Sequence, residues 1–316
     1  MADKLPVVLV TGFLGSGKTT LISRLLSHPA MGQTAVIVNE LGEVGIDHHL
    51  LRQVDERTVL LKNGCVCCSL RGDLAEELRD LLSRRERGEI PSFRRVVVET
   101  TGVAAPGPVV YTLLAEPVVR HHYRLESIVA TVDAVHGLVG PEAVRQVAAA
   151  DTVVVTKADL VEPEAVVERV ERLNPTADVV SAEFGDVEPE RLLAGCGRER
   201  PVGEAVVSHD GEEIGAVSLL FDEPLDWTAF GIWLTMLLQA RGQDVLRVKG
   251  LLDVGAAGPV LLNAVQHVVH PPDHLEAWPD EDRRSRLVFI GRGLEREALE
   301  RSLAAFTRAG RPPHRT

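Results

Sequence analysis

The chain has 316 residues, 45% of them hydrophobic and 25% charged, so it is long enough for two globular domains. Its formal net charge is −12, and an acidic chain repels phosphate backbones, which argues against a role in nucleic-acid binding. No run approaches the roughly 20 apolar residues that a membrane helix needs, and the N-terminus lacks the layout of a signal peptide. We therefore expect a cytoplasmic protein with no membrane partner.

Short apolar runs alternate with amphipathic segments over the first two thirds of the chain. Runs rich in Val and Ile, which predict strands, occupy residues 6–12, 34–40, 58–64, 94–102, 127–134 and 151–159. Helical spacing occurs at residues 18–28, 70–87 and 163–173. Strands that are apolar at successive positions are buried on both faces, and their alternation with helices is typical of a parallel, doubly wound sheet. We predict an α/β domain of the P-loop NTPase type over residues 1–200.

A second, smaller domain is indicated by a change of pattern near residue 201. Strands are expected at residues 215–221, 244–254, 259–269 and 286–291, and helices at residues 226–240 and 295–306. Asp226 is suited to cap the first of these helices and Gly242 to end it. We predict a small α+β domain of three or four strands and two helices over residues 204–310, after a Gly-rich linker at residues 195–203.

The segment "GFLGSGKT" matches the phosphate-loop motif G-x-x-x-x-G-K-[ST] and lies between a predicted strand and a predicted helix. The glycines of this motif let backbone N–H groups surround phosphate oxygens, the lysine places a charge on the β- and γ-phosphates, and the final hydroxyl coordinates Mg²⁺. The residues concerned are Gly12, Gly15, Ser16, Gly17, Lys18 and Thr19. The sequence therefore predicts a nucleoside triphosphate site with Mg²⁺.

The segment "TKAD" follows a later predicted strand and resembles the guanine-reading motif of P-loop GTPases. Its Lys157 and Asp159 have the required spacing. The carboxylate there accepts two N–H bonds that guanine supplies and adenine does not, while the lysine stem packs along the base. Thr156 stands where many GTPases have Asn. This segment favours GTP and argues against an ATP-dependent kinase or ligase.

The segment "ETTG" ends another predicted strand and supplies a carboxylate and a glycine. Glu99 is suited to hold Mg²⁺ directly or through water, and Gly102 is suited to donate its N–H to a γ-phosphate. An acidic strand end without a ligand is the alternative interpretation.

Together these motifs resemble those of the CobW family of P-loop GTPases, which is related to the nickel-delivery GTPases of hydrogenase and urease maturation. "GFLGSGKTT", "NELGEVGID", "NGCVCC", "ETTG" and "TKAD" occur in the family's order, and "RVKG", "AVQHVVH" and "SRLVFIG" resemble its C-terminal domain. The resemblance implies metal-dependent GTP hydrolysis and the delivery of zinc or cobalt. The long His-rich stretch of many members is absent, which argues against metal storage.

Roles for individual residues are also implied by the resemblance. Thr20 joins the phosphate loop, and Glu40 and Asp47 fall in the first switch, where either reaches Mg²⁺ or the transferred metal. Glu99 and Gly102 correspond to the second switch. Lys18, Thr19 and Glu99 are then the groups expected to carry catalysis.

Three of the chain's four cysteines lie within four positions, at Cys65, Cys67 and Cys68. Thiolates favour Zn²⁺ and in some sites Co²⁺. Three thiolates leave one tetrahedral position open, which suits metal transfer more than structural metal binding. A disulfide switch and simple packing are the alternatives from the residues themselves, and the resemblance, in which this segment binds metal between the switches, favours metal.

We expect a GTPase that acts as a metallochaperone for zinc, with cobalt as the next choice, and that couples GTP hydrolysis to metal transfer to a client metalloprotein. A nucleotide-binding metal sensor or buffer with little turnover is one alternative. An activator of one metalloenzyme, such as a nitrile hydratase or a cobalamin-pathway chelatase, is another. We also consider a nucleotide-dependent homodimer.

Overall fold

The computed structural model describes residues 4–39, 59–63, 70–193 and 214–309. The chain divides into two compact units, Met1–Glu171 with Ala177–Arg198 and Arg172–Thr176 with Glu199–Thr316. The domain boundary predicted between residues 200 and 204 lies outside the described residues. None of the helices in the described ranges is long and apolar enough to cross a membrane.

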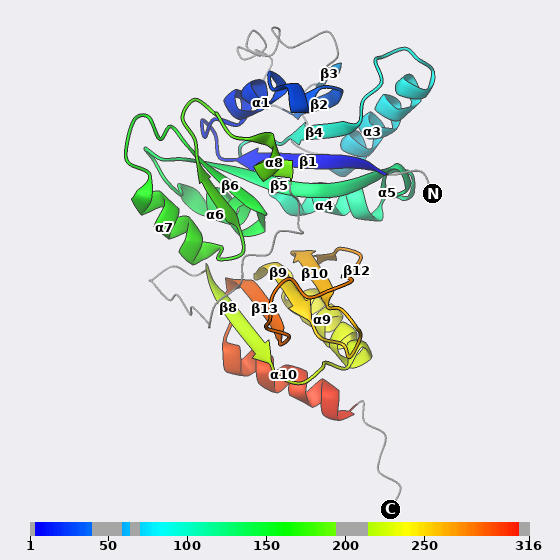
Figure 1. Cartoon of the computed structure of the whole chain (residues 1–316), viewed down its shortest axis with the longest axis vertical. Coiled ribbons are helices and arrows are strands. Elements are labelled where there is room, and N and C mark those ends of the chain that lie inside the picture. Colours follow the sequence, from blue (N-terminus) through cyan, green and yellow to red (C-terminus); the bar gives the residue numbers. More distant parts are fainter. Residues whose placement is uncertain (1–3, 40–58, 64–69, 194–213, 310–316) are drawn as a thin grey trace, which may run out of the picture. The chain divides into compact units, whose positions relative to one another are not determined.

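The first unit contains a seven-stranded sheet with the order β3-β2-β4-β1-β5-β6-β7, and every neighbouring pair in it is parallel (Figure 1). The strands are β1 (Leu5–Gly12), β2 (Thr34–Asn39), β3 (Val59–Asn63), β4 (Arg95–Glu99), β5 (Tyr123–Asp133), β6 (Thr152–Thr156) and β7 (Asp178–Ser181). The helices are α1 (Lys18–Leu26), α3 (Leu70–Glu86), α4 (Pro106–Ala115), α5 (Pro117–His122), α6 (Gly140–Ala149), α7 (Glu164–Leu173) and α8 (Pro189–Leu193), with a 3₁₀ turn η1 (Pro29–Met31). The predicted α/β class is confirmed.

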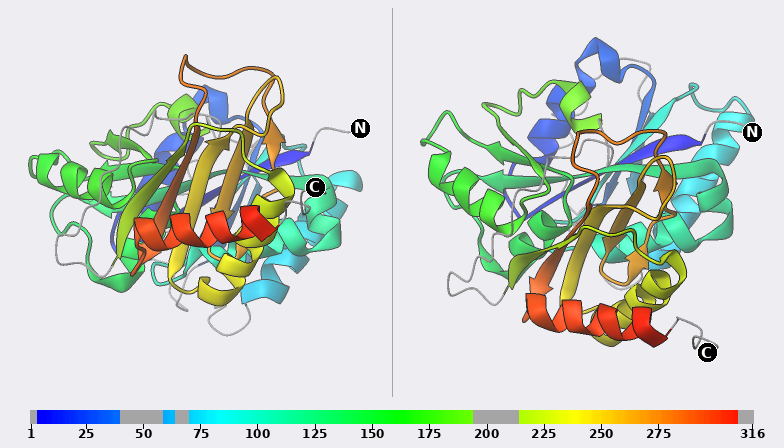
Figure 2. Two further views of the ribbon diagram at one scale, coloured as in Figure 1. Left: turned by 90° about the horizontal axis from the view of Figure 1, so that it is seen from below. Right: turned by 60° about the horizontal axis from the view of Figure 1, so that its bottom comes forward.

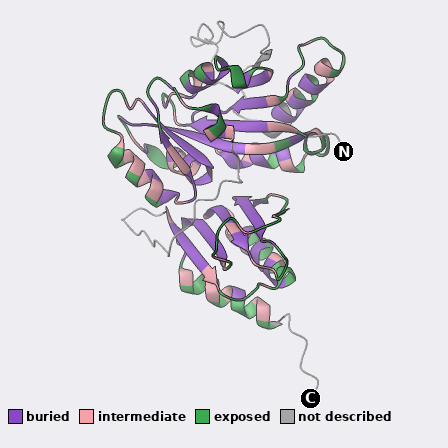
Figure 3. Cartoon of the chain, viewed as in Figure 1, coloured by how far each residue is buried: buried purple, intermediate pink, exposed green. Residues whose placement is uncertain are grey.

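Helices cover both faces of this sheet, and Figure 1 shows α1 and α4 on opposite sides of it. Val8 and Val10 of β1 pack in one cluster with Leu21 and Ile22 of α1. Side chains alternate along a strand, so Leu9 points to the other face, where it is also fully buried. Figure 3 shows the strands as mostly buried, which is the physical basis of the continuous Val and Ile runs.

The strand order makes the carboxyl end of β1 the natural place for a ligand. The chain runs to β2 and β3 on one side of β1 and to β5, β6 and β7 on the other, and ligands of open parallel sheets bind where the strand order reverses in this way. The register aligns polar strand ends along this edge, because Gly12 lies opposite Thr131 and Asp133 lies opposite Thr156.

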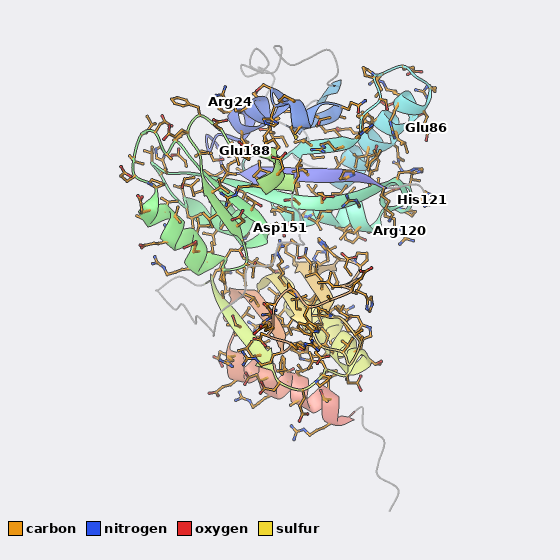
Figure 4. The ribbon with its side chains drawn as sticks, in the orientation of Figure 1. Arg24, Glu86, Arg120, His121, Asp151 and Glu188 are labelled. Carbon is orange, nitrogen blue, oxygen red and sulfur yellow. The ribbon has the colours of Figure 1, made fainter. Side chains whose placement is uncertain are left out.

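Asp151, directly before β6, links the middle of β5 to the start of β7 (Figure 4). Its Oδ2 accepts the N–H of Ile128 at 2.9 Å, and its own N–H donates to the Ile128 carbonyl at 2.8 Å. Its carbonyl accepts the N–H of Asp178 at 2.9 Å. The "TKAD" segment at the far end of β6 is therefore held in register with its neighbours.

The second unit contains an antiparallel sheet with the order β11-β10-β9-β13-β8, and β12 pairs with β10. The elements are β8 (Ile214–Phe221), α9 (Trp227–Arg241), β9 (Val245–Leu252), β10 (Val260–Val265), β11 (Val268–Val269), β12 (Asp273–His274), β13 (Ser285–Arg292) and α10 (Arg296–Ala309). Figure 2 shows α9 and α10 against the same face of the sheet. The predicted α+β class is confirmed.

The helices of this unit end and pack as the sequence indicates. Asp226 caps α9 by accepting the Ala229 N–H at 3.0 Å, and Gly242 is its C-cap. Trp233 is 1% exposed, packs edge-on against Phe289 and lies in the core with residues of α9, α10 and the sheet. An aromatic side chain of this size contributes heavily to the core.

One predicted strand of the second unit is wrong. Residues 259–269 form a hairpin of β10 and β11, in which Val265 pairs with Val268. Gln266 takes a left-handed conformation with φ of 53° at the turn. Gln is not among the residues that usually mark such turns, so the apolar run on both sides gave no sign of a break.

Candidate functional site

The phosphate loop between β1 and α1 depends on its glycines. Gly12, Gly15 and Gly17 have φ values of 144°, 72° and 91°. Residues other than glycine rarely adopt such positive φ values. A Cβ atom on Gly12 would also lie 2.2 Å from Thr131 Oγ1 and 2.6 Å from the Thr131 carbonyl oxygen. The backbone can follow this tight course against β5 only because no side chain is present.

The loop is held by hydrogen bonds to two other strands. Ser16 Oγ lies 2.6 Å from Thr131 Oγ1, and the Ser16 carbonyl accepts the Thr156 hydroxyl at 2.8 Å. Thr156, predicted as a base-side residue, is therefore a support of the phosphate loop. Lys18 is 8% exposed, and its Nζ donates to the carbonyls of Gly12 at 3.0 Å and Phe13 at 3.2 Å. These two carbonyls thus hold the Lys18 ammonium group within the loop.

The first turn of α1 is suited to bind an anion. Gly17 is its N-cap and makes no side-chain cap hydrogen bond, and no acidic residue occurs in the first turn. The N–H groups of a first helical turn and the positive end of the helix dipole favour a phosphate at this position. Thr20, also predicted here, is exposed on the same turn.

Thr19 and Glu99, predicted from separate motifs, lie together. Thr19 Oγ1 donates to Glu99 Oε1 at 3.0 Å, and Glu99 is 5% exposed. The segment after Glu99 is tied to β1, because the Thr100 N–H donates to the Val10 carbonyl at 2.9 Å. A hydroxyl and a carboxylate oxygen beside a phosphate loop are the hard oxygen ligands that Mg²⁺ prefers, so these residues fit the ion.

Asp133, at the end of β5, was missed by the sequence reasoning. Its carboxylate accepts hydrogen bonds from Lys157 Nζ, from His136 Nδ1 at 2.9 Å and from the Val135 N–H at 2.8 Å. Burial alone would raise the pKa of this carboxyl group, but the three hydrogen bonds outweigh it and leave the pKa below its ordinary value. The sequence does show that Asp133 ends a strongly apolar predicted strand, and this position could have marked it as a candidate site residue.

The base-side turn is formed by the ends of β6 and β7. Lys157 adopts φ of 59°, and Asp159 is exposed in the turn that follows. The Ala158 N–H donates to the Ala182 carbonyl at 3.3 Å, which joins this turn to the chain beyond β7. Phe184, 70% exposed and with φ of 50°, belongs to that second stretch and was also missed.

A cavity of about 200 Å³ lies beside the phosphate loop. Its lining comes from the phosphate loop, the end of β5, the loop after β5 and the start of α6. The lining residues are Phe13, Leu14, Ser16, Thr131, Val132, Asp133, His136, Gly137, Val139 and Ala143. The walls are mainly apolar, and Asp133 and His136 are its titratable side chains.

The predicted metal-binding cysteines Cys65, Cys67 and Cys68, and the first-switch residues Glu40 and Asp47, lie outside the described residues. The chain leaves β3 at Asn63, which pairs with Asn39 at the carboxyl end of β2. Because the sheet is parallel, this end of β3 lies at the edge from which the phosphate loop extends. Among the residues that the structure describes, no group of three or more His, Cys, Asp or Glu side chains could hold a metal ion.

Comparison with known families identifies both units. Residues 6–181 match the model of the CobW/HypB/UreG nucleotide-binding domain. The chain belongs to the CobW/HypB/UreG family. Residues 214–307 match the C-terminal domain of the cobalamin synthesis protein cobW, so the resemblance stated from the motifs is confirmed in both parts.

Several members of the CobW/HypB/UreG family are similar to the chain over nearly its full length. The zinc chaperone YjiA of Escherichia coli (strain K12) is 33% identical over 96% of this chain and 99% of its own. The zinc chaperone CobW of Pseudomonas aeruginosa is 31% identical over 95% of this chain and 91% of its own. The crystal structure of Zn(II)-bound YjiA GTPase from E. coli superposes with a TM-score of 0.74, at 31% identity, over 96% of this chain and 99% of that one.

Proposed function

We propose that the protein is a GTPase that delivers zinc to a client metalloprotein. The observation that carries the proposal is the convergence at one sheet edge of a phosphate loop, the Thr19–Glu99 pair and the base-side Lys157. The similar proteins described as zinc chaperones and as a GTPase support both halves of the proposal.

For nucleotide binding, the backbone N–H groups of Gly15 and Gly17 and the first turn of α1 would surround the phosphates. Lys18 would exchange its carbonyl partners for phosphate oxygens. Thr19 and Glu99 would hold Mg²⁺, joined in this proposal by Glu40 or Asp47, and the ion would neutralise charge on the β- and γ-phosphate oxygens.

For base selection, Asp159 would accept the two N–H groups of guanine. Its exposed position in the turn after β6 leaves the carboxylate accessible to a ligand. Lys157 would lie along the base with its ammonium group directed by Asp133. This arrangement favours GTP, because adenine presents no matching pair of donors.

For zinc, the transferred ion would be held by Cys65, Cys67 and Cys68, with Co²⁺ as the alternative ion. In the chain this segment comes between β3 and α3, and β3 ends at the sheet edge that also carries the phosphate loop. A change in the switches between GTP and GDP would alter the thiolate geometry and release the ion to the client.

The test is an anaerobic Zn²⁺ titration of the full chain with GTP, with GDP and without nucleotide. Cys67→Ser should lower zinc affinity by at least about tenfold, because a ligand is lost. Cys196→Ser, which replaces the one cysteine outside the cluster, is the matched control and should bind zinc as the wild type does. Zinc affinity that ignores both the nucleotide and Cys67→Ser would contradict the proposed coupling.

Hydrolysis is measured separately, as phosphate release from GTP in the presence of an ATP competitor. Turnover that rises with zinc or with a client supports a chaperone. Zinc binding with negligible turnover under every condition would favour the metal sensor or buffer instead. The nucleotide-dependent homodimer that we also propose is tested by the molar mass in solution with GDP and with a GTP analogue.

A further inference from the structure

A buried glutamine on α6 contacts the segment that follows Glu99. Gln146 is 1% exposed, and its Nε2 donates to the carbonyls of Gly102 and Ala104, each at 3.1 Å. Two carbonyl oxygens can only face the amide nitrogen, so the orientation of the side-chain amide is settled by its partners. Among the described residues, Gln146 Oε1 has no hydrogen-bond partner, so the side chain serves as a donor to this one segment.

The segment lies against the phosphate loop. A Cβ atom on Gly102 would be 2.6 Å from Leu14 Cδ2 and 2.7 Å from the Leu14 backbone nitrogen. The segment is tied to β1 through the Thr100 N–H and closes on itself through the Ala104 N–H, which donates to the Thr101 carbonyl at 3.0 Å. Gln146 holds it from the side of α6.

The chemistry of this contact goes beyond packing. Burying an amide is unfavourable unless it is hydrogen-bonded, and a leucine would fill the same place in a core helix at no such cost. The two donors of Gln146 match two carbonyls that flank Val103, which is 45% exposed. Gln146 holds the Ala104 carbonyl, and the Ala104 N–H in turn donates to the Thr101 carbonyl at 3.0 Å. The Gly102 N–H lies in the same planar trans peptide as the Thr101 carbonyl, so its direction is restrained with it.

We propose that Gln146 is a positioning residue for γ-phosphate recognition. By holding the Gly102–Ala104 backbone against the phosphate loop, it presets the N–H groups of the segment for a triphosphate. The inference rests on the GTPase function proposed above. The proposed role affects GTP and not GDP, because GDP lacks the γ-phosphate that this segment would contact.

The test compares Gln146→Leu and Gln146→Glu with wild type in the full-length protein. Both variants keep the approximate volume and lose the paired donors, and the glutamate also sets negative oxygens against two carbonyls. Expected results are a fall in kcat/KM for GTP of about tenfold or more and a GDP affinity within about twofold of wild type. A purely structural role would change the melting temperature without this split between GTP and GDP.

The matched control is Thr112→Val on α4. This near-isosteric change removes a buried donor whose hydroxyl bonds within its own helix, to the Pro108 carbonyl at 3.1 Å, and leaves the segment untouched. It should leave both nucleotide measurements at the wild-type values.

Hydrogen exchange without nucleotide keeps the inference separate from the proposed function. In Gln146→Leu the amides of residues 100–104 should exchange about tenfold faster than in wild type, since their anchor is lost. A wild type that does not hydrolyse GTP would overturn the proposed function, while the exchange result would still test the anchor. Active wild type with unchanged kcat/KM and unchanged exchange in both Gln146 variants would overturn the inference.

Discussion

Replacing Asp133 by Asn tests whether a buried carboxylate sets the position of the base-side lysine. Asp133 is 7% exposed and accepts hydrogen bonds from Lys157, His136 and the Val135 N–H. Asn has the same shape and keeps an oxygen for the Val135 N–H, but it removes the negative charge. The Lys157 ammonium group would then face a neutral amide.

The size of the effect follows from the exposure of the two partners. A hydrogen bond to a charged group contributes about 1.5–3 kcal/mol when it is buried. The Lys157 side chain is 35% exposed, so solvent screening reduces the expected loss to about 1–2 kcal/mol. This corresponds to about five- to thirtyfold in affinity. GTP and GDP should lose affinity equally, because both carry guanine, and the preference over ATP should narrow.

The assay is equilibrium titration with GDP and with a GTP analogue, followed by competition with ATP. Asp80→Asn is the matched control, because it neutralises a carboxylate of an exposed pair with Arg84, at 3.7 Å on α3. The reasoning is refuted if Asp133→Asn binds GDP within about twofold of wild type, since Lys157 would then not depend on Asp133.

Three further outcomes are expected. Gly102→Ala should reduce GTP turnover by about tenfold or more, because the new methyl group would meet the Leu14 backbone at 2.7 Å; GDP affinity at the wild-type value is the companion result in the same titration. Trp233→Ala should lower the free energy of unfolding of the second unit by about 3–5 kcal/mol, measured in urea, and a loss under about 1 kcal/mol would contradict its role in the core. Arg284 lowers the pKa of Asp282 from 3.8 to about 2, so this carboxylate stabilises the fold above pH 3.8 and the contribution is lost as the pH falls to about 2. The free energy of unfolding of Asp282→Asn should therefore be lower than that of wild type at pH 5 and equal to it below about pH 2.

The elements and motifs that sequence reasoning found share a local origin. The phosphate loop could be read directly because Gly12, Gly15 and Gly17 need left-handed backbone and Lys18 follows them at fixed spacing. The parallel sheet followed from strands that are apolar on both faces. The hairpin at Gln266 was missed because neither Gln266 nor its neighbours in the chain are residues that usually mark a turn.

By itself, the sequence determined the α/β class of the first unit, the nucleotide motifs and the family, because each depends on residues close together in the chain. The tertiary structure alone decided which distant groups support those motifs. Asp133 meets Lys157 across 24 positions and Gln146 meets Gly102 across 44. The parallel register of β5 and β6 creates the first contact, and the packing of α6 beside the end of β4 creates the second. No local spacing encodes either contact, because each depends on how separate strands and helices align.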